Sequence, residues 1–208
     1  MNNNKKISLA LMSASAYTAA QIIANVLSTK ITLLPVIGLA MDGGTVLYPL
    51  TFTLRDFVHK TCGKKGARTV VIFAAFLSLL AFFFFWLVGI MASDPAWTFQ
   101  NDYENILMPI ARITLASILA QVVSELIDTE VFSAVYKKFN DITGSLVSNF
   151  IALIVDSVIF CLIAFLGTMP FSTVLSIILS NILIKFIISL ISAPAIRLIP
   201  RTAEEDDM

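Results

Sequence analysis

Residues 69–92 read TVVIFAAFLSLLAFFFFWLVGIMA and contain no charged side chain. A helix that crosses the hydrocarbon core of a bilayer needs about 20 predominantly apolar residues. This stretch meets that requirement without help from its neighbours. It predicts that the chain is an integral membrane protein.

Five other stretches complete the set of predicted membrane helices. One of them is short and carries Pro49, Arg55 and Asp56, whereas the rest are long and apolar. The predicted helices span residues 7–28, 45–62, 69–92, 109–136, 146–166 and 171–193. With no internal repeat or linker to divide it, the sequence predicts an all-α membrane protein, a compact bundle of six transmembrane helices in one domain, residues 1–208.

Residues 31–41 are apolar but too short to cross a bilayer, and they contain Pro35 and Gly38. We interpret them as a re-entrant or interfacial segment between the first two helices, which is tolerable only where protein covers its backbone. The following Asp42, Gly43 and Gly44 are residue types typical of a turn.

Composition supports the membrane interpretation and limits the partners. Hydrophobic residues make up 58% of the chain and charged residues 13%, compared with about a quarter charged in soluble domains. The net charge is zero, which does not favour nucleic acid as a partner. Cys62 and Cys161 lie in different predicted helices and His59 is the only histidine, so we expect no disulfide, no metal site and no cofactor.

Basic residues predict the orientation, because Lys and Arg collect on the cytoplasmic side of a membrane. They precede the first helix and follow the second, fourth and sixth, which places both termini in the cytoplasm. Residues 5–16 also resemble a cleavable signal peptide, but the apolar run continues to Leu27 and favours an uncleaved first helix. These basic residues are Lys5, Lys6, Lys60, Lys64, Lys65, Arg68, Lys137, Lys138, Arg197 and Arg201.

Charged residues inside the predicted helices are the main indication of function. A charge at the centre of a membrane helix costs roughly 2.5 to 3.5 kcal/mol even on a lenient scale. A chain that keeps charges of both signs there is expected to use them on a polar substrate or an ion. They are Arg55, Asp56, Arg112, Glu125, Asp128, Asp156 and Lys185.

Helical spacing predicts that several of these groups meet. At about 1.5 Å of rise per residue, the charges on the second, fourth, fifth and sixth helices reach a similar depth near the midplane, where transporter sites form. Polar residues also recur along single helix faces, and lipid would penalise such faces unless they pointed inward. The residues on these faces are Gln121, Glu125, Asp128, Asn149, Asp156, Asn181, Lys185, Ser189 and Ser192.

Two other interpretations of these charges are weaker. They could be purely architectural, for instance as an ion pair between Asp156 and Lys185, but carboxylates outnumber their basic partners. An intramembrane enzyme could use Glu125 and Asp128 as acid and base, but no nucleophile or metal ligand accompanies them. A binding site for a polar substrate is therefore preferred, and the chain is not expected to be an enzyme.

Four motifs in order resemble those of the queuosine precursor transporter family. They are residues 48–56 (YPLTFTLRD) with Gly63, residues 124–132 (SELIDTEVF), Ser148-Asn149 with Asp156-Ser157 and Phe160, and Lys185, while Asn25 and Lys30 also match. The resemblance covers about residues 20 to 195. It implies a small six-helix importer of 7-deazaguanine bases in the bacterial inner membrane, used to make queuosine in tRNA. Lys60 stands where many relatives carry Glu, so no acidic role is carried over to that position.

A guanine-like base suits the residues that the resemblance assigns to the site. Its adjacent N–H and amino donors fit one carboxylate, Glu125 or Asp128. Asparagines would contact the remaining edge of the base, and aromatic rings would stack on its face. A second carboxylate, Asp156 or Asp56, would pair with an aminomethyl cation where the base carries one. The predicted binding residues are Asn25, Phe52, Asp56, Gln121, Glu125, Asp128, Phe132, Asn149, Asp156, Phe160 and Lys185.

The chain has no phosphate-binding GxxxxGK[ST] loop, so we do not expect it to hydrolyse ATP itself. The sequence leaves two energy sources open, which are proton coupling and facilitated entry. The alternative function is the substrate-binding subunit of an energy-coupling-factor importer. In that case the spacing of alanines on the first helix would suit docking of the subunit to the shared module of the importer. The expected partners are a small-molecule substrate and the lipid bilayer, and a homodimer is an open alternative to a monomer.

Overall fold

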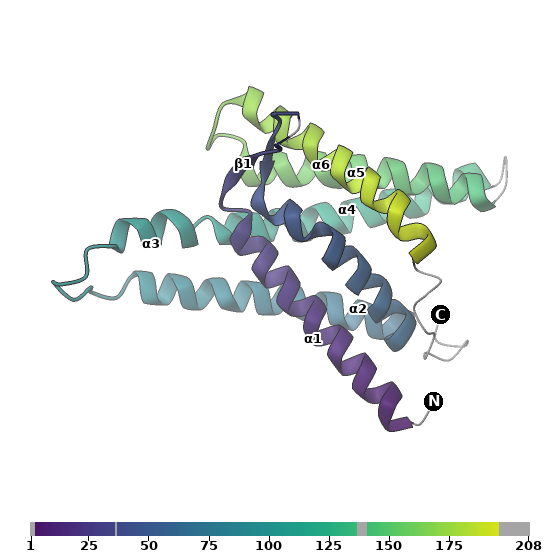
Figure 1. Cartoon of the computed structure of the whole chain (residues 1–208), viewed down its shortest axis with the longest axis horizontal. Coiled ribbons are helices and arrows are strands. Elements are labelled where there is room, and N and C mark those ends of the chain that lie inside the picture. Colours follow the sequence, from purple (N-terminus) through teal and green to yellow (C-terminus); the bar gives the residue numbers. More distant parts are fainter. Residues whose placement is uncertain (1–2, 36, 137–140, 196–208) are drawn as a thin grey trace. The chain divides into compact units, whose positions relative to one another are not determined.

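The computed structural model describes residues 3–35, 37–136 and 141–195. Two short strands and a 3-10 turn interrupt a chain of helices (Figure 1). The elements in order are α1 (Asn3–Leu27), β1 (Ile31–Leu33), β2 (Ala40–Asp42), η1 (Gly43–Leu47), α2 (Tyr48–Gly89), α3 (Gln100–Leu107), α4 (Ile110–Tyr136), α5 (Asp141–Phe165) and α6 (Phe171–Ala195).

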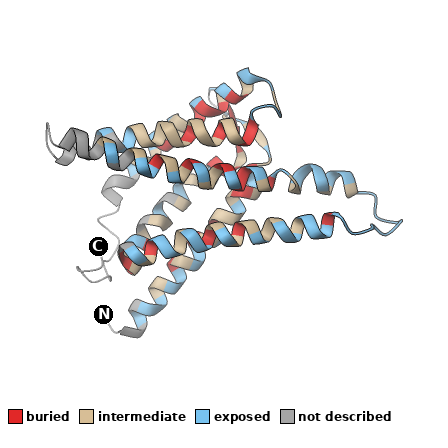
Figure 2. Cartoon of the chain, turned by 180° about the vertical axis from the view of Figure 1, so that it is seen from behind, coloured by how far each residue is buried: buried red, intermediate tan, exposed pale blue. Residues whose placement is uncertain are grey.

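The predicted helical class is confirmed. Within the described residues, four helical segments are long and apolar enough to cross a membrane, and Asn149–Phe165 is a shorter apolar helix. The four are Ile7–Leu27, Lys65–Gly89, Gln100–Ile127 and Phe171–Ile191. Figure 2 shows exposed residues along much of these helices, and many of them are large hydrophobic side chains such as Phe73, Leu126 and Ile191. An apolar exterior of this kind is suited to lipid rather than to water.

The second and third predicted helices both lie in α2, which consists of two helices that meet at Gly63, and residues 64–68 between the predicted helices are helical as well. A single residue, Gly63, has non-helical angles within α2, with φ 70° and ψ 178°. Glycine adopts positive φ at little cost because it has no Cβ. The chain therefore changes direction at one glycine instead of through a loop.

The predicted re-entrant or interfacial segment forms an antiparallel hairpin. Ile31 pairs with Asp42 and Leu33 with Ala40, and Gly38 has a φ of 65° in the connection. The turn predicted at Asp42-Gly43-Gly44 is present as the 3-10 turn η1, which begins at Gly43. Asp42 itself is the last residue of β2 and is buried.

The short helix α3 was not predicted, since residues 93–108 read as a polar loop. It is held to the end of α2 by polar side chains. The Tyr103 hydroxyl donates to the Phe85 carbonyl at 2.9 Å, and Gln100 Nε2 donates to the Gly89 carbonyl at 2.7 Å. The bond from Gln100 satisfies the carbonyl of Gly89, the last residue of α2, which has no partner within the helix, and Tyr103 gives the Phe85 carbonyl one turn earlier an additional donor.

The chain divides into two compact units. Unit 1 comprises Met1–Lys30, Gly43–Ala111 and Ile188–Met208, and unit 2 comprises Ile31–Asp42 and Arg112–Ile187. The core of unit 1 lies where α1 packs on α2. It contains Tyr17, Val58, Ala67 and Ala74, and a 3.0 Å hydrogen bond between the hydroxyls of Ser13 and Thr61 also joins the two helices.

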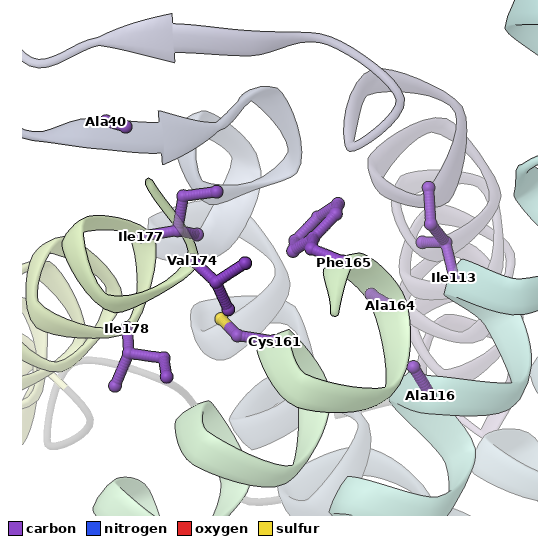
Figure 3. Close-up of a cluster of buried hydrophobic side chains, with 9 residues drawn as sticks. All are labelled: Ala40, Ile113, Ala116, Cys161, Ala164, Phe165, Val174, Ile177 and Ile178. Carbon is purple, nitrogen blue, oxygen red and sulfur yellow. The ribbon is translucent and has the colours of Figure 1, made fainter. Parts of the chain in front are cut away.

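The core of unit 2 brings together α4, α5, α6 and the hairpin (Figure 3). Small residues from α4 and α5, Ala116 and Ala164, lie beside larger ones such as Phe165 and Ile177. Close packing of membrane helices depends on small residues of this kind. The cluster consists of Ala40, Ile113, Ala116, Cys161, Ala164, Phe165, Val174, Ile177 and Ile178.

Candidate transport site

A buried ion pair joins α5 to α6 within unit 2. Lys185 Nζ lies 2.5 Å from Asp156 Oδ2, and the side chains of the two residues are 10% and 28% exposed. The pairing that the sequence suggested between these two residues is therefore present. Because Lys185 is buried and Asp156 is half-buried, much of their mutual attraction offsets their desolvation.

A second buried carboxylate, Asp42, lies in the same unit. It is 2% exposed, and Asn181 Nδ2 donates to its Oδ2 at 3.0 Å. The same amide nitrogen lies 3.5 Å from the thiol sulfur of Cys161. Asn181 thus connects the hairpin and α5 through one side-chain amide.

The strand β2 is fastened along α6 by two serine hydroxyls. The Ala40 N–H donates to Ser176 Oγ at 2.8 Å, and Ser180 Oγ donates to the Ala40 carbonyl at 2.7 Å. A two-stranded hairpin is marginally stable alone, and its free edge must be satisfied where water is scarce. These bonds fix the position of Asp42, two residues further along β2.

Ser157 adds a polar group that is fully buried. Its side chain has 0% exposure, and its hydroxyl makes no hydrogen bond within the part of the chain that the structure describes. Ser157 follows Asp156 and precedes Cys161 by one helical turn, so Ser157 and Cys161 share a face of α5. An unsatisfied buried hydroxyl is rare in native proteins and calls for an explanation.

Arg112 has a local structural role. Its Nε and one terminal nitrogen donate to the carbonyls of Ile163 and Leu166, each at 2.5 Å. Ile163 lies in the last turn of α5 and Leu166 directly follows the helix, and the dipole at this end of a helix attracts a cation. The charge of Arg112 is thus used in capping a helix.

The remaining predicted residues of unit 2 are more dispersed. Gln121 Nε2 donates to Glu125 Oε1 at 3.2 Å, as their shared helix face predicts, but Glu125 is exposed, as is Asn149. Phe160 is half-buried, and its ring lies edge-to-face on Phe165 with centroids 5.8 Å apart. Their binding roles stay predictions.

Of the predicted residues in unit 1, Asn25 is buried on α1. Phe52 and Asp56 occupy positions in α2, but their side chains lie outside the described ones, as do those of Asp128 and Phe132 in α4. No structural role is assigned to these four side chains.

Asp42 and Asn181 are the main residues that the predicted set of binding residues omitted. Asn181 carried a detectable signal, because it lies four residues before Lys185 on the same face of α6. Asp42 carried none, because an Asp-Gly-Gly sequence is typical of a turn. Its burial depends on Asn181, which is 139 positions away in the chain.

The chain is similar to proteins described as transporters. Residues 42–199 match the protein family described as "Putative vitamin uptake transporter". The chain is also 32% identical to a "Probable queuosine precursor transporter" of Bacillus subtilis (strain 168), over 163 residues that cover 76% of this chain and 70% of that protein. No solved structure matches the chain.

The family match and the similarity to the Bacillus subtilis protein place the chain among multi-pass membrane transporters, not enzymes. More particularly, the chain belongs to the putative vitamin uptake transporter family.

Proposed function

We propose that this protein imports queuosine precursors, 7-deazaguanine bases, across the bacterial inner membrane, with both termini in the cytoplasm. The observation that carries the proposal is the buried polar cluster of unit 2, formed by Asp42, Asp156, Asn181 and Lys185 among apolar helices. Charges kept at membrane depth mark substrate or ion pathways. The name of the Bacillus subtilis relative supports a 7-deazaguanine as the substrate.

The chemistry of the cluster suits a flat base rich in N–H donors. A carboxylate accepts two parallel N–H bonds from the ring N–H and the exocyclic amino group. A second carboxylate pairs with an aminomethyl cation where the substrate carries one. Asn25, Phe52, Asp56, Gln121, Glu125, Asp128, Phe132, Asn149 and Phe160 complete the proposed set of binding residues.

The test uses a bacterium that can neither make nor import queuosine precursors and that lacks energy-coupling-factor modules. The chain is expressed in it, each candidate base is fed, and queuosine in tRNA is measured. We expect restoration by the chain alone, loss of restoration with Lys185→Met, and full activity with the exposed control Lys65→Met.

Two outcomes would contradict the proposal. Restoration that appears only when energy-coupling-factor modules are added would favour the alternative, a substrate-binding subunit of such an importer. No restoration in either strain, with the protein verified in the membrane, would indicate a different cargo. The family's description as vitamin uptake transporters makes a vitamin the first cargo to examine in that case.

A further inference from the structure

Polar contacts join α5 to α6 along one line, which we call the α5–α6 seam. At one end of the seam Lys185 Nζ binds Asp156 Oδ2. One helical turn along α6, Asn181 Nδ2 lies 3.5 Å from Cys161 Sγ. The two contacts therefore fix which side of α5 faces α6.

Ser157 lies on that side of α5. A helix turns by about 100° per residue, so Ser157 lies about 100° and Cys161 about 140° around the helix axis from Asp156. Because Asp156 and Cys161 both contact α6, Ser157 faces α6 between them. Its side chain is fully buried there.

The hydroxyl of Ser157 has no partner in this arrangement. It makes no hydrogen bond within the described part of the chain, although a serine in a helix can bond to a carbonyl of its own preceding turn. A buried hydroxyl without a partner destabilises the state in which it occurs. Since the seam is closed around this hydroxyl, a polar partner can reach it only when α5 and α6 separate. The buried hydroxyl therefore favours an open seam that holds a polar ligand.

The edge of the seam is where a ligand can enter. Asp156 and Phe160 are one turn apart on α5, about 40° from each other around its axis. Both are half-buried, whereas Ser157 and Cys161 are buried. A carboxylate and an aromatic ring thus lie at the edge, and the hydroxyl lies behind them. A flat base with N–H donors would meet a group that binds it and a group that stacks on it before it reached the hydroxyl.

We propose that the α5–α6 seam is the substrate site in its closed state, and that it opens at Asp156 and Phe160 so that the Ser157 hydroxyl bonds to the polar edge of the base. This inference rests on the proposed function and deepens it, because it adds a contact residue and names the two helices that must separate. A hydroxyl both donates and accepts hydrogen bonds. It can therefore pair with the ring carbonyl or with a ring N–H of a 7-deazaguanine.

The first test measures by calorimetry the affinity of the purified protein in nanodiscs for 7-deazaguanine. Ser157→Ala should weaken binding by about threefold or more, while the melting temperature of the unliganded protein stays unchanged or rises. Thr114→Val is the matched control, because it removes another buried hydroxyl that has no partner among the described residues. Thr114 lies on α4, outside the seam, and its variant should bind 7-deazaguanine like wild type.

The second test measures whether the seam opens. Ser157→Cys is placed in a protein whose own thiols are removed by Cys62→Ser and Cys161→Ser, and the reaction of the introduced thiol with N-ethylmaleimide is followed. We expect this thiol to react in the unliganded protein and saturating 7-deazaguanine to abolish the reaction. Ala164→Cys, at a buried core position two turns along the same face of α5, is the control and should stay unreactive.

The outcomes separate this inference from the proposed function. If wild-type protein binds 7-deazaguanine and Ser157→Ala keeps that affinity, the hydroxyl is not a ligand contact, and the inference fails while the function stands. Equal losses of affinity in Ser157→Ala and Thr114→Val would overturn it too, because they would show a general effect on packing. A Ser157→Cys thiol that reacts only after the protein is unfolded would exclude the opening of the seam. If wild-type protein does not bind 7-deazaguanine, the proposed function itself fails.

Discussion

The ion pair between Lys185 and Asp156 gives the most quantitative prediction. At 2.5 Å and an effective dielectric constant of about 20, the attraction between the two charges is about 7 kcal/mol. Removing them from water costs several kcal/mol for each ion. The pair as a whole therefore contributes little to the free energy of unfolding, whereas a single remaining charge keeps its desolvation cost and loses the attraction.

Removing one charge should thus destabilise the protein far more than removing both. We expect Lys185→Met and Asp156→Asn each to lower the free energy of unfolding by about 3–5 kcal/mol, and the double variant to lie within about 1 kcal/mol of wild type.

The measurement is unfolding by SDS in mixed micelles, followed by circular dichroism. Lys65→Met and Glu130→Gln make the same chemical changes at exposed positions and should have little effect. Additive losses in the double variant would refute the reasoning, because they would show that the two charges are stabilised by separate partners. A Lys185→Met variant as stable as wild type would refute it equally.

Three further substitutions test the backbone and a helix end. Gly43→Ala should lower the free energy of unfolding by about 1–3 kcal/mol, because a Cβ there would lie 2.5 Å from the backbone oxygen of Leu27; an unchanged SDS midpoint would contradict this. Gly63→Ala should lower the free energy of unfolding by about 1–2 kcal/mol, because the residue has a φ of 70°. The same SDS titration measures this, and a gain in stability would show that the break in α2 is not required. Arg112→Ala should cost about 1 kcal/mol and speed amide hydrogen exchange at the C-terminal end of α5, and unchanged exchange there would exclude the capping role.

The sequence predicted the helices well, because length and apolar composition are sufficient to identify a membrane span. It also predicted that Asp156 and Lys185 could meet, since counting the rise per residue gives the depth of each charge. What it could not predict was which residue ends a helix. The glycine-induced break at Gly63 occupies one position, and the lysines around it made the same region read as a loop.

The hairpin shows where sequence-based reasoning fails for a physical reason. Its strands, Ile31–Leu33 and Ala40–Asp42, are three residues each, too short to display an alternating pattern. They form because hydroxyls far along the chain on α6 satisfy the edge of β2. The burial of Asp42 has the same origin, and no local pattern encodes a partner in another part of the chain.

The fastening of β2 to α6 restricts the positions that these two elements can take. Serines recur at 172, 176 and 180 of α6, a ladder with steps of about 6 Å. A displacement of the strand by one step toward the start of α6 would give Ala40 hydroxyl partners again, at Ser172 and Ser176. Asp42 would then lie opposite Ile177 instead of Asn181, so the carboxylate would lose its amide. Intermediate positions would leave the strand edge unsatisfied. The strand can therefore be satisfied on α6 only at discrete positions, one helical turn apart. Asn181 favours one of these positions, because it is the residue that holds the Asp42 carboxylate there.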